Sequence, residues 1–181
     1  KLAFGSIVVA MLISIPLGIA AATHHRSWLD GVSMVTAMLG LSMPSFWLGL
    51  LLIILFSLKL GWLPSGGSEG FVSIILPAIT LGAGQAGNLT RITRSSMWEV
   101  IRQDYLRTAR AKGVSEKKVI YKHALKNALI PIITIFGSTL GNALGGAVAI
   151  ETVFSWPGVG RLTVSAINNR DMTLATGCII M

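Results

Sequence analysis

The chain has 181 residues, of which 52% are hydrophobic and 12% are charged, and its mean hydropathy is +0.71. One soluble core could not keep so much apolar surface away from water, so these values exclude a soluble globular protein. The formal net charge is +8, but the basic residues lie in loops between uncharged runs. This is the positive-inside pattern of membrane proteins, and it disfavours nucleic acid as a partner. We therefore expect an all-α, polytopic transmembrane helical bundle in a lipid bilayer.

Two long uncharged runs come first in the chain. The run from Leu2 to Ala22 has 21 residues, and about 20 residues suffice to cross the hydrocarbon layer. The run from Gly31 to Leu58 has 28 residues and is expected to break at Pro44. The loop between the runs contains His24 and His25. Neighbouring residues point in different directions on a helix and no third ligand is near, so we interpret this loop as basic and interfacial rather than as a metal site.

A turn-rich connector, residues 59–70, leads to a third uncharged run, Phe71 to Thr90. This run carries Gln85 and Asn88 near its far end. Polar amides at membrane depth either pair across helices or line an aqueous path, and the sequence leaves both open. A broken membrane helix can also line a cavity, because its freed backbone groups need partners that lipid does not supply. The candidate residues of a translocation path are Ser42, Pro44, Gln85 and Asn88.

A fourth run, Ala128 to Ile150, contains three glycines spaced four residues apart. Gly137, Gly141 and Gly145 lie on nearly one face of a helix. A face of small residues lets two helix backbones approach closely, as in the G-x-x-x-G pattern. We therefore predict that this face packs tightly against a neighbouring helix.

The last part of the chain is polar first and then apolar again. Residues 151–171 contain a turn-forming cluster at 155–160, and the segment around Ser165 is expected to form a short helix at the membrane surface. Residues 172–181 would begin a fifth span. Because the chain opens inside an apolar run and stops ten uncharged residues into another, we expect one transmembrane domain over residues 1–181. It would be a fragment that lacks an N-terminal helix and the rest of the last helix. The single Cys178 rules out an intramolecular disulfide.

Ten of the fifteen Lys and Arg residues lie in one segment, residues 91–127, beside only three acidic residues. Loops rich in Lys and Arg stay on the cytoplasmic side of a membrane. Counting spans from this segment places residues 24–30 inside and residues 59–70 and 151–171 outside. All four loops agree with this topology.

Residues 91–127 also have the pattern of two helices joined by a glycine turn. Apolar residues three and four apart predict a helix over 96–112, and Gly113 suits the left-handed position that ends a helix. Ser115 is placed to cap a second helix that runs toward Leu125. This segment could bind anionic lipid head groups, fix the topology, or pack on its own protein. The small and apolar residues at the turn favour a fourth interpretation, which is insertion into a groove of another protein.

Four stretches of the sequence resemble one known family. They are Asp104–Gly113 (DYLRTARAKG), His123–Ala128 (HALKNA), Glu151–Leu162 (ETVFSWPGVGRL) and Ser42–Trp47 (SMPSFW). Together they look like the permease of a binding-protein-dependent ABC importer, and more narrowly like its dipeptide, oligopeptide and nickel branch. The resemblance covers essentially the whole chain and is specific to the branch, but not to the cargo.

This resemblance implies a type I importer permease in which residues 91–127 are a cytoplasmic loop that docks into an ATPase subunit. The loop would transmit closure of the ATPase to the membrane helices. The coupling residues implied are Arg107, Thr108, Ala109, Arg110, Ala111, Lys112, Gly113 and Val114. The wider family motif, aligned on Gly113, is matched at Ala109, Gly113 and Leu125. Its glutamate is missing here, because Arg107 occupies that position.

The resemblance also implies ABC ATPase subunits, a second related permease subunit or second copy, and an extracytoplasmic solute-binding protein. The complex would lie in a bacterial or archaeal cell membrane. ATP and Mg²⁺ would bind the ATPase subunits, because this sequence has no G-x-x-x-x-G-K-[ST] loop. We expect no catalytic residue, cofactor or metal ligand in this chain. Peptides are the first expected cargo, followed by nickel or a metal chelate and then glutathione-like molecules.

Two other classes of function compete with an importer subunit. A self-contained secondary transporter or channel would need ionisable residues in the membrane as a relay. The four complete uncharged runs contain no Asp, Glu, Lys or Arg. A membrane enzyme would need a catalytic set at membrane depth, and the sequence offers no such set. The subunit of an ATP-driven importer is therefore the expected function.

Overall fold

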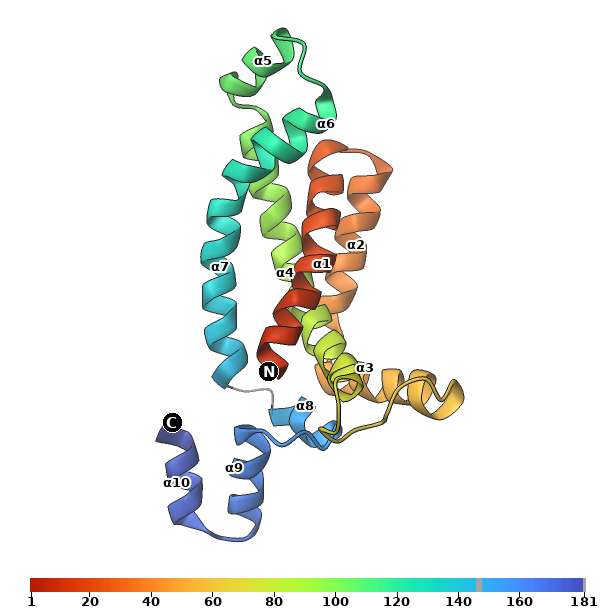
Figure 1. The fold of residues 1–181 in the computed structure, drawn as a ribbon, viewed down its shortest axis with the longest axis vertical. Coiled ribbons are helices and arrows are strands. Elements are labelled where there is room, and N and C mark those ends of the chain that lie inside the picture. The colour runs from red at the N-terminus through yellow and green to blue at the C-terminus, as the bar shows by residue number, and fades with distance from the viewer. Residues whose placement is uncertain (146–147, 181) are drawn as a thin grey trace. The chain divides into compact units, whose positions relative to one another are not determined.

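A computed structural model describes residues 1–145 and 148–180, except for the side chains of residues 140–145. Every regular element within these ranges is a helix (Figure 1). The elements in chain order are α1 (Leu2–Thr23), α2 (Trp28–Ser42), α3 (Ser45–Leu52), the π-helix η1 (Ile53–Lys59), the 3₁₀ turn η2 (Val72–Ile74), α4 (Ile75–Ile101), α5 (Asp104–Ala111), α6 (Glu116–Lys118), the π-helix η3 (Val119–Ala124), α7 (Leu125–Gly145), α8 (Val148–Val153), α9 (Val159–Asn168) and α10 (Met172–Ile180). The all-α fold class is confirmed.

Several of these helices are long and apolar enough to cross a membrane. Three pass by themselves: Leu2–Thr23, Val72–Ile101 and Glu116–Thr139. Helix α2 and the α3–η1 segment pass the same test together, which gives a fourth span if they count as one. The expected fifth span is present as α10, whose nine residues are fewer than the about 20 needed to cross a bilayer. The described chain therefore has three or four candidate spans, and α10 lies where the truncated fifth was expected.

The second apolar run breaks where the sequence predicts. Helix α2 ends at Ser42 and α3 begins at Ser45. Pro44 is the N-cap residue of α3, with φ −57° and ψ 130°. Proline has no N–H to donate and its ring clashes with the preceding turn, so the start of a helix suits it best, although Pro16 and Pro131 lie inside α1 and α7. Pro44 therefore begins a new helix instead of bending a continuous one.

Two helix boundaries before the glycine turn differ from the expectation. The predicted single helix over 96–112 is wrong, because α4 continues as far as Ile101 and α5 begins separately at Asp104. Gln103, which precedes α5, has an extended backbone with φ −70° and ψ 146°. The carboxylate of Asp104 lies in the first turn of α5, where the helix dipole favours a negative charge. Helix α4 also runs past Thr90, since a charged residue ends an apolar run without ending a helix.

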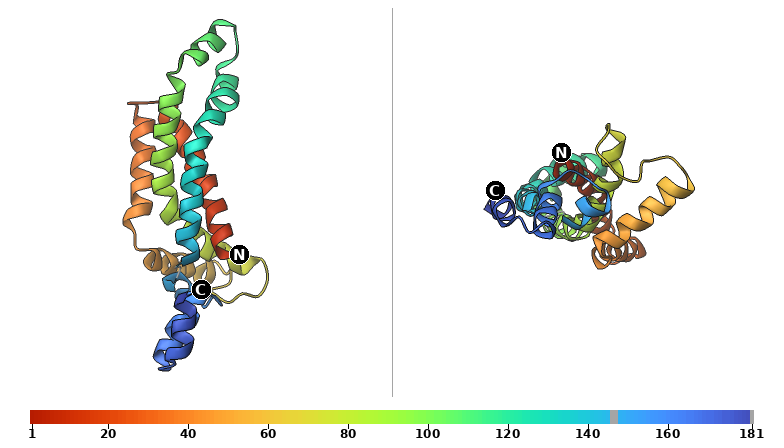
Figure 2. Two further views of the ribbon diagram at one scale, coloured as in Figure 1. Left: turned by 90° about the vertical axis from the view of Figure 1, so that its left-hand side faces the viewer. Right: turned by 90° about the horizontal axis from the view of Figure 1, so that it is seen from below.

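Residues 10–42 and 85–139 form one compact unit of the chain. Within it, α4 runs to the hairpin of residues 104–124 and α7 returns from it (Figures 1 and 2). Two glycines allow close helix packing in this unit. A Cβ at Gly18 of α1 would collide with Thr93 of α4, and a Cβ at Gly87 of α4 would collide with the carbonyl oxygen of Ala37 in α2. Segments of α1, α2 and α4 therefore approach with their backbones nearly in contact.

The second compact unit consists of residues 1–9, 43–84 and 140–181. Its core surrounds Phe154, which is fully buried. The other buried members of this core are Leu2, Leu76 and Ile150. The carbonyl oxygen of Phe154 accepts a hydrogen bond of 2.9 Å from the N–H of Gly67. A Cβ at Gly49 would lie 3.0 Å from the Phe154 ring, so a larger residue at position 49 would crowd the ring.

The stretch Glu151–Leu162 is a folded turn that caps α9. A carboxylate oxygen of Glu151, Oε2, accepts a hydrogen bond of 2.8 Å from the N–H of Arg161 in the first turn of α9. Gly158 and Gly160 leave space for this carboxylate, since a Cβ at either position would collide with it. A carboxylate at the N-terminus of a helix satisfies an otherwise unpaired N–H and interacts favourably with the helix dipole. The short helix expected around Ser165 is present as α9.

Candidate functional site

The candidate coupling site is the hairpin formed by α5, the turn at Gly113 and the α6–η3 segment. Gly113 has φ 77°, the left-handed conformation that the sequence predicts for it. Its N–H donates a hydrogen bond of 2.9 Å to the carbonyl oxygen of Arg110, and the N–H of Val114 donates one of 3.2 Å to that of Ala109. No described atom lies within 4 Å of the position that a Cβ on Gly113 would occupy. The backbone conformation, and not lack of space, is therefore what requires glycine here.

The hairpin has a small core of its own. Helix α5 packs against η3, and Leu106 and Val119 are both fully buried. Asn127 at the start of α7 donates a hydrogen bond of 2.7 Å to the phenolic oxygen of Tyr105. The expectation that this segment could pack on its own protein is therefore realised on one side of the hairpin. Self-packing gives the turn a defined shape before it meets a partner.

A bidentate ion pair closes the turn itself. Arg110 donates from Nε to Oε2 of Glu116 at 3.0 Å and from a terminal nitrogen to Oε1 at 2.8 Å. The Glu116 carboxylate raises the pKa of Arg110 further above its ordinary value through this hydrogen bond. Because both side chains are partly exposed, such a pair contributes at most about 1 kcal/mol, and its main effect is to orient the two arms. Ser115 is the N-cap residue as predicted, but its side chain makes no capping hydrogen bond to a described residue.

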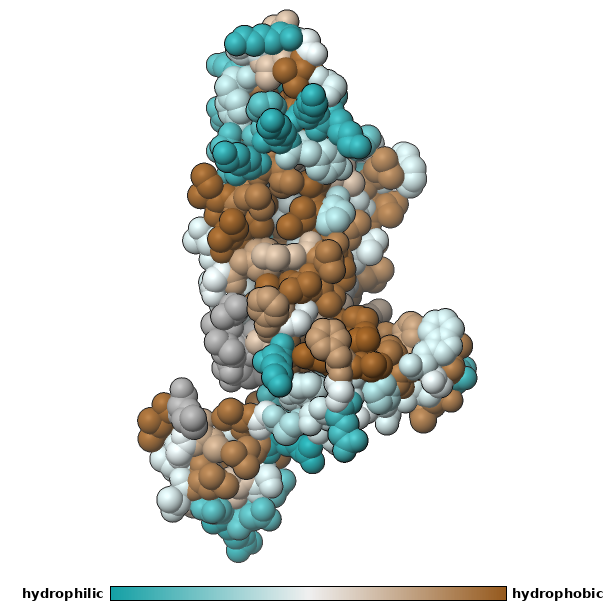
Figure 3. Space-filling model, in the orientation of Figure 1, coloured by the Kyte–Doolittle hydropathy of each residue, from teal (hydrophilic) through white to brown (hydrophobic). Residues whose placement is uncertain are grey.

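The eight coupling candidates divide into an exposed set and a half-buried set. Arg107, Thr108, Ala111, Lys112 and Gly113 are exposed, and Ala109, Arg110 and Val114 are half-buried. The exposed tip therefore presents small side chains flanked by two cations. Figure 3 shows a hydrophilic surface over α5 and α6 and a hydrophobic one over the helices below the hairpin. A polar tip on an apolar stem suits a segment that leaves the membrane to contact a soluble partner.

The four path candidates have different surroundings. The Ser42 hydroxyl donates to the carbonyl oxygen of Met38 in its own helix at 2.9 Å, and Pro44 begins α3. Asn88 accepts a hydrogen bond of 3.0 Å from Arg91 one turn along α4. The buried Oε1 of Gln85 has no hydrogen-bond partner among the described residues. An amide oxygen with this placement needs water, cargo or another subunit as its partner. Their role in a path stays a prediction.

The glycine face of α7 is described only in part. Gly137 has no described neighbour within 4 Å of a Cβ position. The surroundings of Gly141 and Gly145 lie outside what the structure describes. Tight packing through this face therefore stays a prediction. The close approaches seen at Gly18 and Gly87 do not follow the G-x-x-x-G pattern and were not predicted.

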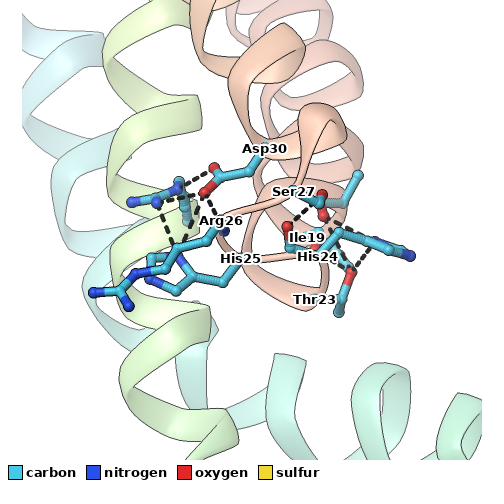
Figure 4. Close-up of polar contacts among 9 residues, drawn as sticks. Ile19, Thr23, His24, His25, Arg26, Ser27 and Asp30 are labelled. Carbon is cyan, nitrogen blue, oxygen red and sulfur yellow. Dashed lines mark hydrogen bonds and ion pairs between the residues drawn. The ribbon is translucent and has the colours of Figure 1, made fainter.

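A charged cluster missed in the sequence lies where α2 begins. Asp30, in the first turn of α2, is only 6% exposed. Arg94 of α4 donates to its two carboxylate oxygens, from Nε at 2.6 Å and from a terminal nitrogen at 2.8 Å. The N–H of Arg26 donates a third hydrogen bond to Asp30, at 3.0 Å. Figure 4 shows the Asp30 carboxylate turned toward α4.

His25 and Trp98 extend this cluster along α4. Nδ1 of His25 lies 3.0 Å from the same terminal nitrogen of Arg94 that contacts Asp30. The His25 ring packs against Trp98 with ring centroids 3.8 Å apart and ring planes tilted by 36°, and the guanidinium of Arg102 lies 5.6 Å from the Trp98 ring centre. His24 points to the other side of the loop (Figure 4), so the adjacent histidines do not share a ligand. In the sequence, this cluster was indicated only by a single acidic residue, Asp30, in a loop that is otherwise basic.

Comparison with known proteins places the chain in a family. Residues 14–181 match the family of binding-protein-dependent transport system inner membrane components. The glutathione transport system permease protein GsiC of Salmonella choleraesuis (strain SC-B67) is 49% identical over 166 residues, which are 92% of this chain and 54% of that protein. The protein of the same name from Escherichia coli (strain K12) is 48% identical over 166 residues, again 92% of this chain and 54% of the relative. The chain thus spans about half the length of the curated relatives it matches.

Proposed function

This chain belongs to the family of binding-protein-dependent transport system inner membrane components, and on that premise we propose that it forms part of the membrane path of an ATP-driven importer for glutathione or similar short peptides. Hydrolysis of ATP takes place on separate ATPase subunits. A second permease subunit, or a second copy of this chain, completes the path. A solute-binding protein outside the membrane delivers the cargo.

One observation carries the coupling part of this proposal, namely the self-packed hairpin with an exposed tip. Its arms are held by the packing of α5 on η3, in which Leu106 and Val119 are buried, and by the pair of Arg110 with Glu116. A partner that binds the tip therefore meets a preorganised shape and loses little conformational entropy on binding. The exposed cations Arg107 and Lys112 favour a partner cleft with acidic rims, since complementary charge raises the rate of encounter. In this proposal the hairpin is cytoplasmic and enters such a cleft on the ATPase.

The choice of cargo rests on the relatives. The proteins that are 48% and 49% identical to this chain are named as glutathione permeases. Glutathione is a short peptide, which agrees with peptides as the first expected cargo. Nickel, the expected alternative, receives no support from these relatives.

Transport in proteoliposomes tests the proposal. The full-length protein is reconstituted with its ATPase, permease and binding-protein partners, and accumulation of radiolabelled glutathione is measured. We expect accumulation that requires both ATP and the binding protein, that excess short peptide reduces, and that nickel chloride leaves unchanged. An ATPase subunit with its phosphate-loop lysine replaced serves as the matched control. Uptake driven by a proton gradient without ATP would replace the proposal with a secondary transporter, and ATP-dependent uptake of nickel in place of glutathione would overturn the cargo.

A further inference from the structure

The end of α4 and the loop that faces it carry more positive charge than the chain itself neutralises. Residues 24–30 and 91–102 contain four arginines and two acidic residues. One of the acids, Asp30, is already occupied by Arg94 through contacts of 2.6 and 2.8 Å. The other three arginines are exposed, and none of them forms a salt bridge within the described part of the chain. They are Arg26, Arg91 and Arg102.

Two of these arginines are gathered around one pair of rings. The His25 ring lies 3.8 Å from that of Trp98 between centroids, and the guanidinium of Arg102 lies 5.6 Å from the Trp98 ring centre, within the range of a cation–π interaction. Arg26 directly follows His25 and lies on the same side of the loop (Figure 4). Its φ of 64° is uncommon for a residue with a side chain. The hydrogen bond of 3.0 Å from its N–H to Asp30 holds Arg26 in this conformation.

The surface of α2 indicates how deep these side chains lie in the membrane. Its exposed apolar residues include Trp28, Val32 and Val35. Tryptophan is enriched where the hydrocarbon layer meets the lipid head groups. Arg26 comes two residues before Trp28, which places it at the level of the head groups. Arg94 is level with the first turn of α2 because it pairs with a residue of that turn. The guanidinium of Arg102 reaches back to Trp98, one turn from Arg94, so it lies near the same level.

We propose that Arg26 and Arg102, held in place through His25 and Trp98, bind the phosphodiester head group of an anionic phospholipid in the cytoplasmic leaflet. The phosphodiester supplies the negative charge that these two cations lack. A guanidinium can donate two parallel hydrogen bonds to phosphate oxygens, and basic pockets between membrane helices on the cytoplasmic side accommodate lipid head groups. The inference goes beyond the proposed function, because binding of lipid requires neither ATP nor cargo.

An acidic surface of a soluble partner such as the ATPase is the competing ligand. The hairpin of residues 104–124 extends well beyond the loop that joins α1 to α2 (Figures 1 and 2), so its tip meets a soluble protein before the loop does. Arg26 also directly precedes a helix whose exposed surface is apolar. An anionic lipid matches both the charge of the loop and the apolar surface next to it, whereas an acidic protein surface matches only the charge.

Three glutamine substitutions separate a local site from a general attraction by net charge. Arg26→Gln and Arg102→Gln each remove one cation of the site. Both side chains are exposed, and both substitutions leave the pair of Asp30 with Arg94 intact, so the fold is retained. Arg107→Gln is the matched control, because it makes the same change at an exposed arginine of α5, in the hairpin. It lowers the net charge of the chain equally without touching the site.

The experiment measures how much radiolabelled phosphatidylglycerol, relative to phosphatidylcholine, the purified full-length permease retains from mixed micelles without ATPase subunits. We expect the wild type to prefer phosphatidylglycerol, and we expect Arg26→Gln and Arg102→Gln each to reduce that preference by about fivefold, the contribution of one basic residue at a membrane surface. Arg107→Gln should keep the wild-type preference.

Three outcomes would overturn the proposal. An equal loss in Arg107→Gln would mean that net charge alone attracts the lipid. Displacement of phosphatidylglycerol by inorganic phosphate would indicate a site for soluble anions instead. An unchanged preference in both site variants would remove these arginines from lipid binding, and weaker ATPase binding by the same variants would assign them to that partner. Because the measurement contains neither ATP nor cargo, each of these outcomes leaves the proposed transport function standing.

Discussion

Replacement of Gly113 by valine tests whether the hairpin is the coupling element. Gly113 has φ 77°, and no described atom lies within 4 Å of its Cβ position. The substitution therefore creates no collision with a neighbour, and its effect comes from the backbone alone. An L-residue in the left-handed region costs about 1–2 kcal/mol, and a β-branched residue lies at the upper end. The turn is expected to relax to another conformation and to misdirect the tip.

The size of the functional effect follows from that strain. If the partner binds only the observed turn, a cost of about 1–2 kcal/mol reduces the fraction of competent hairpin by about 5- to 30-fold. Gly113→Asn is the matched conservative variant, because asparagine visits the left-handed region more readily than other non-glycine residues. Gly70→Val is the matched control elsewhere, since Gly70 has φ 81° and equally open surroundings but lies in the 59–70 connector.

The assay is a titration of the detergent-solubilised, full-length permease with the ATPase subunit, followed by uptake in proteoliposomes. We expect Gly113→Val to weaken ATPase binding and lower uptake by the same factor, while the amount of protein in the membrane changes little. Gly113→Asn should lose less, and Gly70→Val should bind the ATPase normally. Unchanged ATPase binding and uptake in Gly113→Val would refute the reasoning. Binding of lipid head groups would then be the better explanation of the basic segment.

Two further predictions concern topology and helix packing. In a Cys178→Ser background, an impermeant thiol reagent applied to intact cells should label Ser68→Cys but not Ser115→Cys, and the reverse pattern would invert the orientation inferred from the basic residues. Gly87→Leu should lower the yield of the chain itself, because its side chain would meet the backbone of α2. Gly137→Leu should spare that yield and reduce recovery of the paired permease by size-exclusion chromatography, if the predicted packing of that face is with another chain. Normal pairing of Gly137→Leu would show that the face meets lipid.

Helix positions followed from the sequence where hydrophobicity decides them. The run from Leu2 to Ala22 became α1 almost residue for residue although it contains Pro16, and the break expected at Pro44 is present between α2 and α3. The expected helix over 96–112 failed for a different reason. Residues on both sides of Gln103 favour a helix, so local preference does not mark the break. The length of a hydrophobic run reflects the thickness of the membrane. A helix can continue beyond that run into water, and it ends where a cap or a break in the backbone ends it.

The candidate site was predictable only where one residue type is required by the backbone. Gly113 could be assigned because a left-handed position strongly favours glycine. The pair of Asp30 with Arg94 could not, since its partners are 64 residues apart and neither lies in a recognisable local pattern. Contacts of this kind depend on how α2 packs on α4, and that packing depends in turn on Gly87. Composition and spacing carry no information on which helices become neighbours.

Three glycines in residues 10–42 and 85–139 have two different structural roles. Gly18 and Gly87 are needed for space, and they bring α1 and α2 onto α4 so closely that sliding is excluded. Gly113 is needed for its backbone conformation, and it sets the direction of a hairpin that the extended Gln103 separates from α4. Movement of the hairpin would therefore reach the closely packed helices α1, α2 and α4 through the non-helical backbone at Gln103. The contact of Arg102 with Trp98 lies on the α4 side of that point and does not cross it, whereas the hydrogen bond from Asn127 to Tyr105 joins α5 to the start of α7.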